Sequence, residues 1–385
     1  MPQQTDTLLL LKRARLLLEE GRTAEALSLL ETIQPENEQQ QKELDYLLGW
    51  GNLQSRQWSE AARLLAPFDL FSEQGREVES LNNREIQALC LLKMGNLAIQ
   101  NTRFEEAGRH LLKALKALQD RRVQLPNAHI KAHYYLAGTY KMRGLFTAAI
   151  QEYLQARERS IATDDDRELS FIYEGLAEAY RASGKFFEAL ESGKKALELY
   201  RRADNRKGEC TILNRLGRIA LKLGDHTNAG EYYTESIAIA ATFPNHRGDK
   251  MVMTNCVALA DLRLDEGRIE DAKRFCEHAS QISQRASDNF LSGLADMIIG
   301  KVTYAEAKQA KEQQRYQLME QAIHWFERAS GALAEGEAFD HVAEVQGRWA
   351  EALEDLGQGQ EALRRWKSAY EAKGAAKGPS LEEIW

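Results

Sequence analysis

The chain has 385 residues, of which 43% are hydrophobic and 28% are charged, and only six are proline. This composition excludes a disordered chain and favours a folded, largely helical one that is long enough for a large core. The formal net charge of −7 lacks the basic surplus that a grip on phosphate backbones requires, so we expect no direct nucleic-acid partner.

The N-terminal stretch TLLLLKRARLLLEEG, residues 7–21, is rich in leucine. Lys12, Arg13 and Arg15 interrupt it, so it has neither the apolar centre of a signal peptide nor the length of a membrane span. We therefore expect a cytoplasmic protein with no membrane partner.

An alanine-centred pattern then recurs nine times along the chain. The marker alanines are Ala26, Ala61, Ala107, Ala149, Ala189, Ala229, Ala272, Ala322 and Ala362. Twelve residues before each marker stands a small residue, in chain order Ala14, Gly49, Gly95, Ala137, Ala177, Gly217, Ala260, Ala310 and Ala350. Five residues before the marker a glycine recurs at Gly21, Gly144, Gly184, Gly224, Gly267 and Gly357.

These columns predict a helical hairpin in every segment. The small residue lets the first helix approach the second closely, and the glycine takes the left-handed conformation that ends the first helix. A single hairpin cannot bury its apolar face alone, whereas stacked hairpins share one continuous core.

The pattern resembles the tetratricopeptide repeat, which has small residues at positions 8, 20 and 27 and a bulky one at position 24. The resemblance implies an all-α, right-handed superhelical solenoid of about nine hairpins over residues 1–373, with a tail or cap at 374–385. Successive markers are 35, 46, 42, 40, 40, 43, 50 and 40 residues apart instead of about 34. That spacing is similar to the long-repeat arrays of Pins, kinesin light chain and bacterial peptide-sensing regulators.

Two segments depart from the regular pattern. The widest spacing, between Ala272 and Ala322, predicts an unusually long first helix. At the C-terminal end, Leu381, Ile384 and Trp385 either cover the last repeat or dock on a partner, and covering is favoured because terminal repeats need a cap.

Motifs that suggest catalysis or phosphate binding are better explained by architecture. The Ser183–Lys185 tripeptide lacks Walker spacing and falls at the turn between two helices. The Arg-Gly-Asp sequence at 247–249 is interpreted as a chance loop tripeptide. No nucleophile has an identifiable base partner, so we expect no enzyme activity and no cofactor.

Metal-binding patterns are equally incomplete. His129 and His133 are spaced like a two-histidine zinc clamp, but no third ligand is evident. The acidic run at 163–168 lacks calcium-loop spacing and is interpreted as a helix N-cap. The cysteines form no paired motif and are expected to act as small hydrophobic residues. We predict no metal site.

The resemblance also implies which residues bind a ligand, because the first helix of each repeat lines a concave groove in this family. In the sixth repeat Asn214, Arg218 and Lys222 share one helix face, where an amide and two cations suit a peptide backbone and a carboxylate. The other predicted groove residues are Asn96, Lys131, Tyr134, Lys141, Glu174, Glu178 and Arg181, with Leu92, Gln100, Met142, Asp261 and Asp265 continuing the surface. The alternative is that these are ordinary solvated positions.

Trp50 belongs to the same set, because we expect it to contact a ligand, a second subunit or the N-terminal helix. Two functions fit the whole pattern. One is a non-catalytic scaffold that binds a peptide or protein segment in the concave groove. The other is a peptide- or protein-responsive regulator that acts through a partner, since no DNA-recognition helix is apparent. A homodimer is compatible with both.

Overall fold

The computed structural model describes residues 3–55, 57–65, 81–119, 125–161, 166–286 and 288–377. Regular structure within these ranges is helical throughout, so the predicted all-α fold class is confirmed. No described helix is both long enough and apolar enough to cross a membrane.

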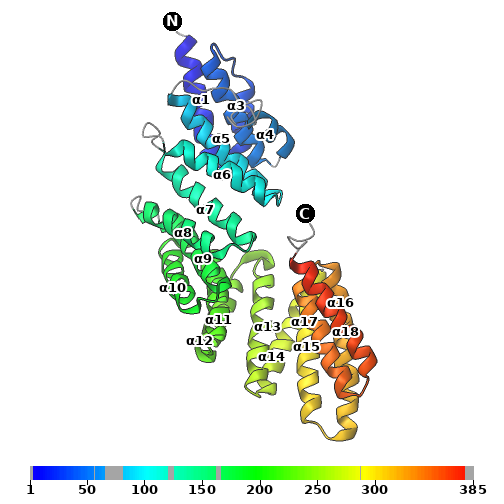
Figure 1. The fold of residues 1–385 in the computed structure, drawn as a ribbon. Coiled ribbons are helices and arrows are strands. Elements are labelled where there is room, and N and C mark those ends of the chain that lie inside the picture. Colours follow the sequence, from blue (N-terminus) through cyan, green and yellow to red (C-terminus); the bar gives the residue numbers. More distant parts are fainter. Residues whose placement is uncertain are drawn as a thin grey trace. The chain divides into compact units, whose positions relative to one another are not determined.

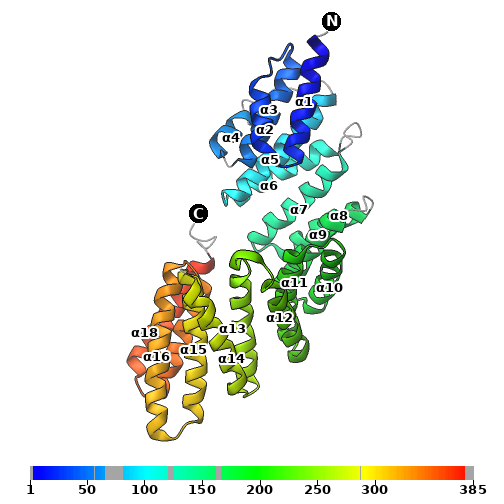
Figure 2. The ribbon, with the colours of Figure 1, turned by 180° about the vertical axis from the view of Figure 1, so that it is seen from behind.

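The chain divides into two compact units, and each is a succession of helical hairpins (Figures 1 and 2). The first unit spans Met1–Ala203 and contains α1 (Gln3–Glu19), α2 (Thr23–Glu31), α3 (Glu38–Gln54), α4 (Trp58–Leu65), α5 (Leu81–Gln100), α6 (Phe104–Leu118), α7 (Pro126–Met142), α8 (Phe146–Ile161), α9 (Asp166–Ala182) and α10 (Phe186–Arg202).

The second unit spans Asp204–Trp385. It contains α11 (Arg206–Lys222), α12 (His226–Ala240), the short 3-10 helix η2 (Pro244–His246), α13 (Asp249–Asp265), α14 (Ile269–Arg285), α15 (Asn289–Gln309), α16 (Glu312–Glu335), α17 (Phe339–Asp355) and α18 (Gly359–Lys377). In both units the odd-numbered helix is the first of its hairpin and the even-numbered helix is the second.

The repeat columns form the interior of the hairpins. All nine marker alanines lie on second helices and are at most 1% exposed. The small column provides close packing: a Cβ added to Gly217 of α11 would lie 2.6 Å from the ring of Tyr233 in α12. The six column glycines all have a positive φ, between 73° and 79°, as the left-handed helix end requires.

Thr102 occupies the glycine column between α5 and α6 and takes the same left-handed conformation, with a φ of 57°. A β-branched side chain is strained there, because its Cβ crowds the backbone. We expect Thr102→Gly to raise the free energy of unfolding by about 0.5–1 kcal/mol, measured by urea denaturation. The reverse change at the matched turn, Gly184→Thr, is expected to destabilise, and a loss of stability in Thr102→Gly would contradict this account.

One residue that the sequence pattern assigns to the small column is wrongly assigned. Ala310 is the C-cap of α15 and does not lie inside the hairpin. Gly300 takes the expected place, since a Cβ there would lie 2.8 Å from the ring of Phe326 in α16. The extra residues of this repeat lengthen both helices, to 21 residues in α15 and 24 in α16. The spacing predicts a long first helix, which α15 is, but it does not predict the long second helix α16.

Contacts between hairpins identify the inner side of each unit. First helices of successive hairpins contact one another, as α3 does with α5, α5 with α7, α11 with α13 and α13 with α15. Second helices of successive hairpins make no comparable contact anywhere in the described part of the chain. Since the first helices are the closer set, they form the inner face of each stack, as the repeat pattern predicts.

The junction between α12 and α13 requires a glycine. A Cβ on Gly248 would lie 1.9 Å from the carbonyl oxygen of Ala240, the last residue of α12. The next residue, Asp249, accepts hydrogen bonds from Nε and Nη2 of Arg285 at 3.1 and 2.7 Å. Two members of the Arg-Gly-Asp tripeptide therefore have structural roles.

Helix α18 continues to Lys377, past the predicted boundary at residue 373. The tail residues Leu381, Ile384 and Trp385, like residues 163–165 of the acidic run, lie outside the described residues. Asp166 of that run is the first residue of α9 and accepts a hydrogen bond from Nε of Arg202 at 3.0 Å.

Candidate functional site

The face of α11 carries the most accessible of the predicted ligand-binding residues. Arg218 and Lys222 are both exposed, one helical turn apart. Neither makes a hydrogen bond or an ion pair with any residue that the structure describes. Two cations on one face without counter-charges are suited to an anionic ligand group.

Asn214, the third residue predicted on this face, is partly buried and has an internal role. Its Nδ2 donates to Oδ1 of Asn255 in α13 at 2.6 Å. Asn255 is fully buried and donates through Nδ2 to Oγ of Ser236 at 2.8 Å, and Ser236 donates to the carbonyl of Cys210 at 2.9 Å. This chain of hydrogen bonds ties α11, α12 and α13 together, so Asn214 positions the face more than it offers a free amide.

The residues predicted on α9 are engaged within the first unit. Arg181 donates to Glu178 with Nη2 at 2.6 Å and Nε at 3.2 Å. Glu174 accepts a hydrogen bond from the hydroxyl of Tyr200 in α10. All three α9 residues are partly buried. They belong to a different unit from Asn214, Arg218 and Lys222.

The α7 residues show a mixture of packing and exposure. Lys131 is exposed, and Met142 is 61% exposed. Tyr134 packs edge-on against Tyr153 with ring centroids 5.8 Å apart, so its ring is part of the interior. Lys141 is partly buried at the end of the helix.

The histidine pair on α7 is a packing feature. The rings of His129 and His133 stack with centroids 6.4 Å apart, and Nδ1 of His133 lies 2.7 Å from Glu152 Oε2. Burial lowers the pKa of His129 below its usual value, with smaller contributions from the charges of Arg159 and His133. Among the described residues no group of three or more His, Cys, Asp or Glu side chains is placed to hold a metal ion.

Trp50 and Asn96 lie on the inner face of the first unit. Trp50 is partly buried against a core cluster to which α1 contributes Leu11 and Leu18, so its ring is not left in solvent. Nζ of Lys93 in α5 lies 4.1 Å from the centroid of the Trp50 ring. Asn96 is partly buried, one turn after Lys93. Lys93 was not expected from the repeat positions.

Lys301 is a second missed residue, on the inner face of the second unit. Its Nζ lies 2.9 Å from both carboxylate oxygens of Asp261 in α13 and also pairs with Glu344 in α17. Lys301 is 4% exposed, so Asp261 is committed to an internal ion pair, whereas Asp265 is exposed. Lys301 was missed because the repeat pattern assigned position 8 to Ala310 instead of Gly300. Gly300 is followed by the charged Lys301, just as Gly217 is followed by the charged Arg218.

This ion triad perturbs the acid–base behaviour of its members. Burial and the Glu344 charge favour a raised pKa at Asp261, and Lys301 only partly opposes them. At Glu344 burial acts in the raising direction, but hydrogen bonds and charges from His341 and Lys301 outweigh it and lower the pKa to about 2. Glu344 therefore stays ionised at neutral pH and holds Lys301 as the cation.

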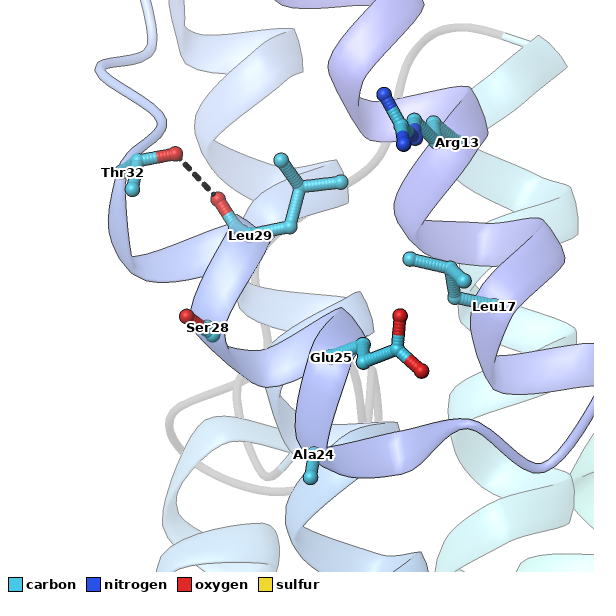
Figure 3. Close-up of a pocket in the computed structure, with 7 residues that line it drawn as sticks. All are labelled: Arg13, Leu17, Ala24, Glu25, Ser28, Leu29 and Thr32. Carbon is cyan, nitrogen blue, oxygen red and sulfur yellow. Dashed lines mark hydrogen bonds between the residues drawn. The ribbon is translucent and has the colours of Figure 1, made fainter.

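A surface depression of about 570 Å³ lies between α1 and α2 (Figure 3). Thr32 donates to the carbonyl of Leu29 at 2.7 Å on its rim. Its lining residues are Arg13, Leu17, Ala24, Glu25, Ser28, Leu29 and Thr32. None of the predicted ligand-binding residues belongs to it, so it gives no support to the groove prediction.

Sequence comparison identifies tetratricopeptide repeats in two segments. Residues 128–202, which include most of α7 and all of α8–α10, match the tetratricopeptide repeat, and so do residues 211–243 in α11 and α12. No curated protein matches the chain significantly.

Solved structures share the fold at low sequence identity. The apo form of RapI is 12% identical with a TM-score of 0.74, covering 97% of this chain and 99% of that one. The apo quorum sensor NprR from B. thuringiensis is 15% identical with a TM-score of 0.68 and coverages of 96% and 99%. The Rap regulator of plasmid pLS20, in complex with the Phr* peptide, is 15% identical with a TM-score of 0.50 and coverages of 95% and 94%.

A fourth similar structure is described as an enzyme. Aspartyl phosphate phosphatase F from Bacillus subtilis is 13% identical with a TM-score of 0.58, and the match covers 97% of this chain and 95% of that one. Likeness at these identities concerns the fold. Residues 128–202 and 211–243 therefore carry tetratricopeptide repeats, and the helical hairpins of the described chain share the fold of these solved structures.

Proposed function

We propose that the chain is a non-catalytic binding protein that holds an extended peptide or protein segment on the inner face formed by its first helices. The observation that carries this proposal is the pair of exposed, unpartnered cations Arg218 and Lys222 on α11. Neighbouring inner-face charges such as Asp261 and Lys301 are satisfied internally, so this pair stands out. An arginine fork and a lysine one turn away are suited to a carboxylate of the ligand.

One similar structure supports a peptide as the ligand class. It is the complex of the Rap regulator of plasmid pLS20 with the Phr* peptide. Since the likeness itself concerns the fold, the inference to this chain rests on the inner-face cations as well. An acidic residue in the peptide matches their charge.

The second candidate function is a peptide- or protein-responsive bacterial regulator that acts through a partner. Two of the similar structures favour it, because one is a quorum sensor and the other is a conjugation gene regulator. In a stack of hairpins, small changes at each repeat add up, so a bound peptide has a means of changing the surface offered to a partner. Small-angle scattering with and without a selected peptide distinguishes a sensor from a static scaffold.

The remaining expectations stay predictions. They are a cytoplasmic location, no direct nucleic-acid or membrane partner, a possible homodimer and no catalysis. The phosphatase among the similar structures makes the last of these the one most in need of a direct assay.

The test is a binding measurement with peptides selected from a random library on the wild-type chain. We expect acidic peptides, and we expect Arg218→Ala/Lys222→Ala to weaken their binding at least tenfold, or about 1.4 kcal/mol. The matched control is Arg274→Ala/Lys367→Ala, which removes two exposed cations from the second helices α14 and α18. Equal losses in the two double variants would contradict the proposal, and so would a wild-type chain that selects no peptide.

A further inference from the structure

We propose that Lys93, Trp50 and Lys131 form an anion-binding site on the inner face of the first unit, which takes a carboxylate or phosphate group. This site lies on other helices than the α11 cations and does not depend on them.

Three first helices bring the site together. Trp50 lies on α3, Lys93 on α5 and Lys131 on α7, and α5 contacts both α3 and α7. The indole is held in place by the core cluster behind it and by Tyr46, whose ring centroid lies 6.1 Å away. Nζ of Lys93 lies 4.1 Å from the indole centroid, so the ring covers one side of the ammonium.

The ammonium of Lys93 makes no ion pair with any carboxylate that the structure describes. It makes no hydrogen bond to a described carboxylate. The charge of Lys131, on the neighbouring first helix α7, repels it. Burial, followed by the charge of Lys131, lowers the pKa of Lys93 to about 8, against small opposing effects of Cys90 and Glu19. A desolvated cation beside another cation is costly unless an anion joins them.

Lys301 shows how the same fold treats a buried lysine that only has a structural role. It is enclosed by Asp261 and Glu344, and these two carboxylates raise its pKa in spite of its burial. Lys93 is partly exposed and lacks such partners. The contrast supports a bound anion as the acceptor for Lys93.

The remaining side chains suit an oxyanion. The ammonium has three donors, and the indole ring satisfies none of them by a conventional hydrogen bond. Asn96 follows Lys93 by three residues on the same helix, so its amide lies on the same face. Lys131 is exposed and adds a second positive charge. A carboxylate or phosphate between them would accept from Lys93, Lys131 and Asn96.

The first experiment uses the free anions as probes on the full chain. Lysine side-chain NMR, with the Lys93 signal assigned from Lys93→Arg, follows the titration of Lys93 in chloride, acetate or inorganic phosphate at equal ionic strength. We expect a midpoint near pH 8 in chloride. It should rise by about one pH unit when the binding anion is at ten times its dissociation constant. A rise in acetate alone identifies a carboxylate site, and a rise in phosphate alone identifies a phosphate site.

An unchanged midpoint in both anions would overturn the proposal, as would an equal rise at the exposed Lys194 of α10. Since no peptide is used, this outcome is independent of whether the chain binds peptides through α11.

Variants separate ligand binding from a structural role. Lys93→Met is expected to abolish anion binding and to leave the melting temperature unchanged or higher, because it removes an unpaired, desolvated charge. Lys194→Met is the matched control and should retain binding. If Lys93→Met unfolds at a lower temperature, or still binds the anion, Lys93 is a packing residue and the proposal is wrong.

Discussion

Replacing Gly248 with alanine is expected to lower the free energy of unfolding by about 3 kcal/mol. The added Cβ would lie 1.9 Å from the carbonyl oxygen of Ala240 and 2.7 Å from its carbonyl carbon. Both are backbone atoms at the end of α12, so no side-chain rotation relieves the clash. The ends of α12 and α13 must separate, and the Asp249–Arg285 hydrogen bonds that follow are disturbed with them. Denaturant unfolding followed by circular dichroism measures the loss.

Gly331→Ala is the control for this change. Gly331 lies in the interior of α16 with no atom within 4 Å of the added Cβ, and its backbone is helical. Alanine is a better helix former than glycine, so we expect a gain of about 0.5–1 kcal/mol. If both alanine variants changed stability by the same amount, the close approach of α12 and α13 at Gly248 would be refuted.

Replacing Lys301 with methionine is expected to cost about 2 kcal/mol. The change leaves Asp261 and Glu344 facing each other without their shared cation. The carboxylate side chains are 36% and 40% exposed, so water relieves part of the repulsion and keeps the cost below the roughly 3–5 kcal/mol of a fully buried pair that loses one partner. The same unfolding measurement applies.

A triple variant tests whether charge, and not packing, explains this loss. Asp261→Asn, Glu344→Gln and Lys301→Met together remove all three charges at nearly constant volume. We expect the triple variant to recover most of the stability that Lys301→Met loses, because no unpaired charge remains. A triple variant as unstable as Lys301→Met would show that the lysine stem, through its packing, is what matters.

Most of the hairpin architecture follows from local sequence. The glycine column succeeds at all six positions because a left-handed helix end admits few other residues. The marker alanines succeed because a second helix packed on both sides has no room for a larger side chain. These are short-range steric requirements, and a sequence displays them directly.

The eighth repeat shows where such reasoning fails. A fixed offset of twelve residues from Ala322 leads to Ala310, but ten extra residues separate Gly300 from its partner Phe326. A small residue is common enough that a wrong one fits the column. The physical partner, a ring packed on the glycine, distinguishes the two and is visible only in three dimensions.

The sequence predicts the positions of the candidate binding residues but not whether their polar groups are free to contact a ligand. Repeat positions correctly place Arg218 and Lys222 on an exposed face, yet they give Asn214 and Glu174 the same status although both are held by internal hydrogen bonds. Lys93 lies outside the repeat positions that are expected to face the groove, and its significance depends on the Trp50 ring in another repeat. Side-chain contacts between helices that are far apart in the sequence decide which polar groups remain free to bind a ligand.

The proposed function rests on unpaired cations on the inner faces. The position of a bound peptide tests this proposal most directly. A peptide selected on the wild-type chain, carrying a photoreactive group, is cross-linked to it, and mass spectrometry identifies the labelled residues. We predict labels on the first helices of the hairpins, above all on α11 around Arg218 and Lys222. Labels confined to second helices or to the hairpin turns would contradict the account.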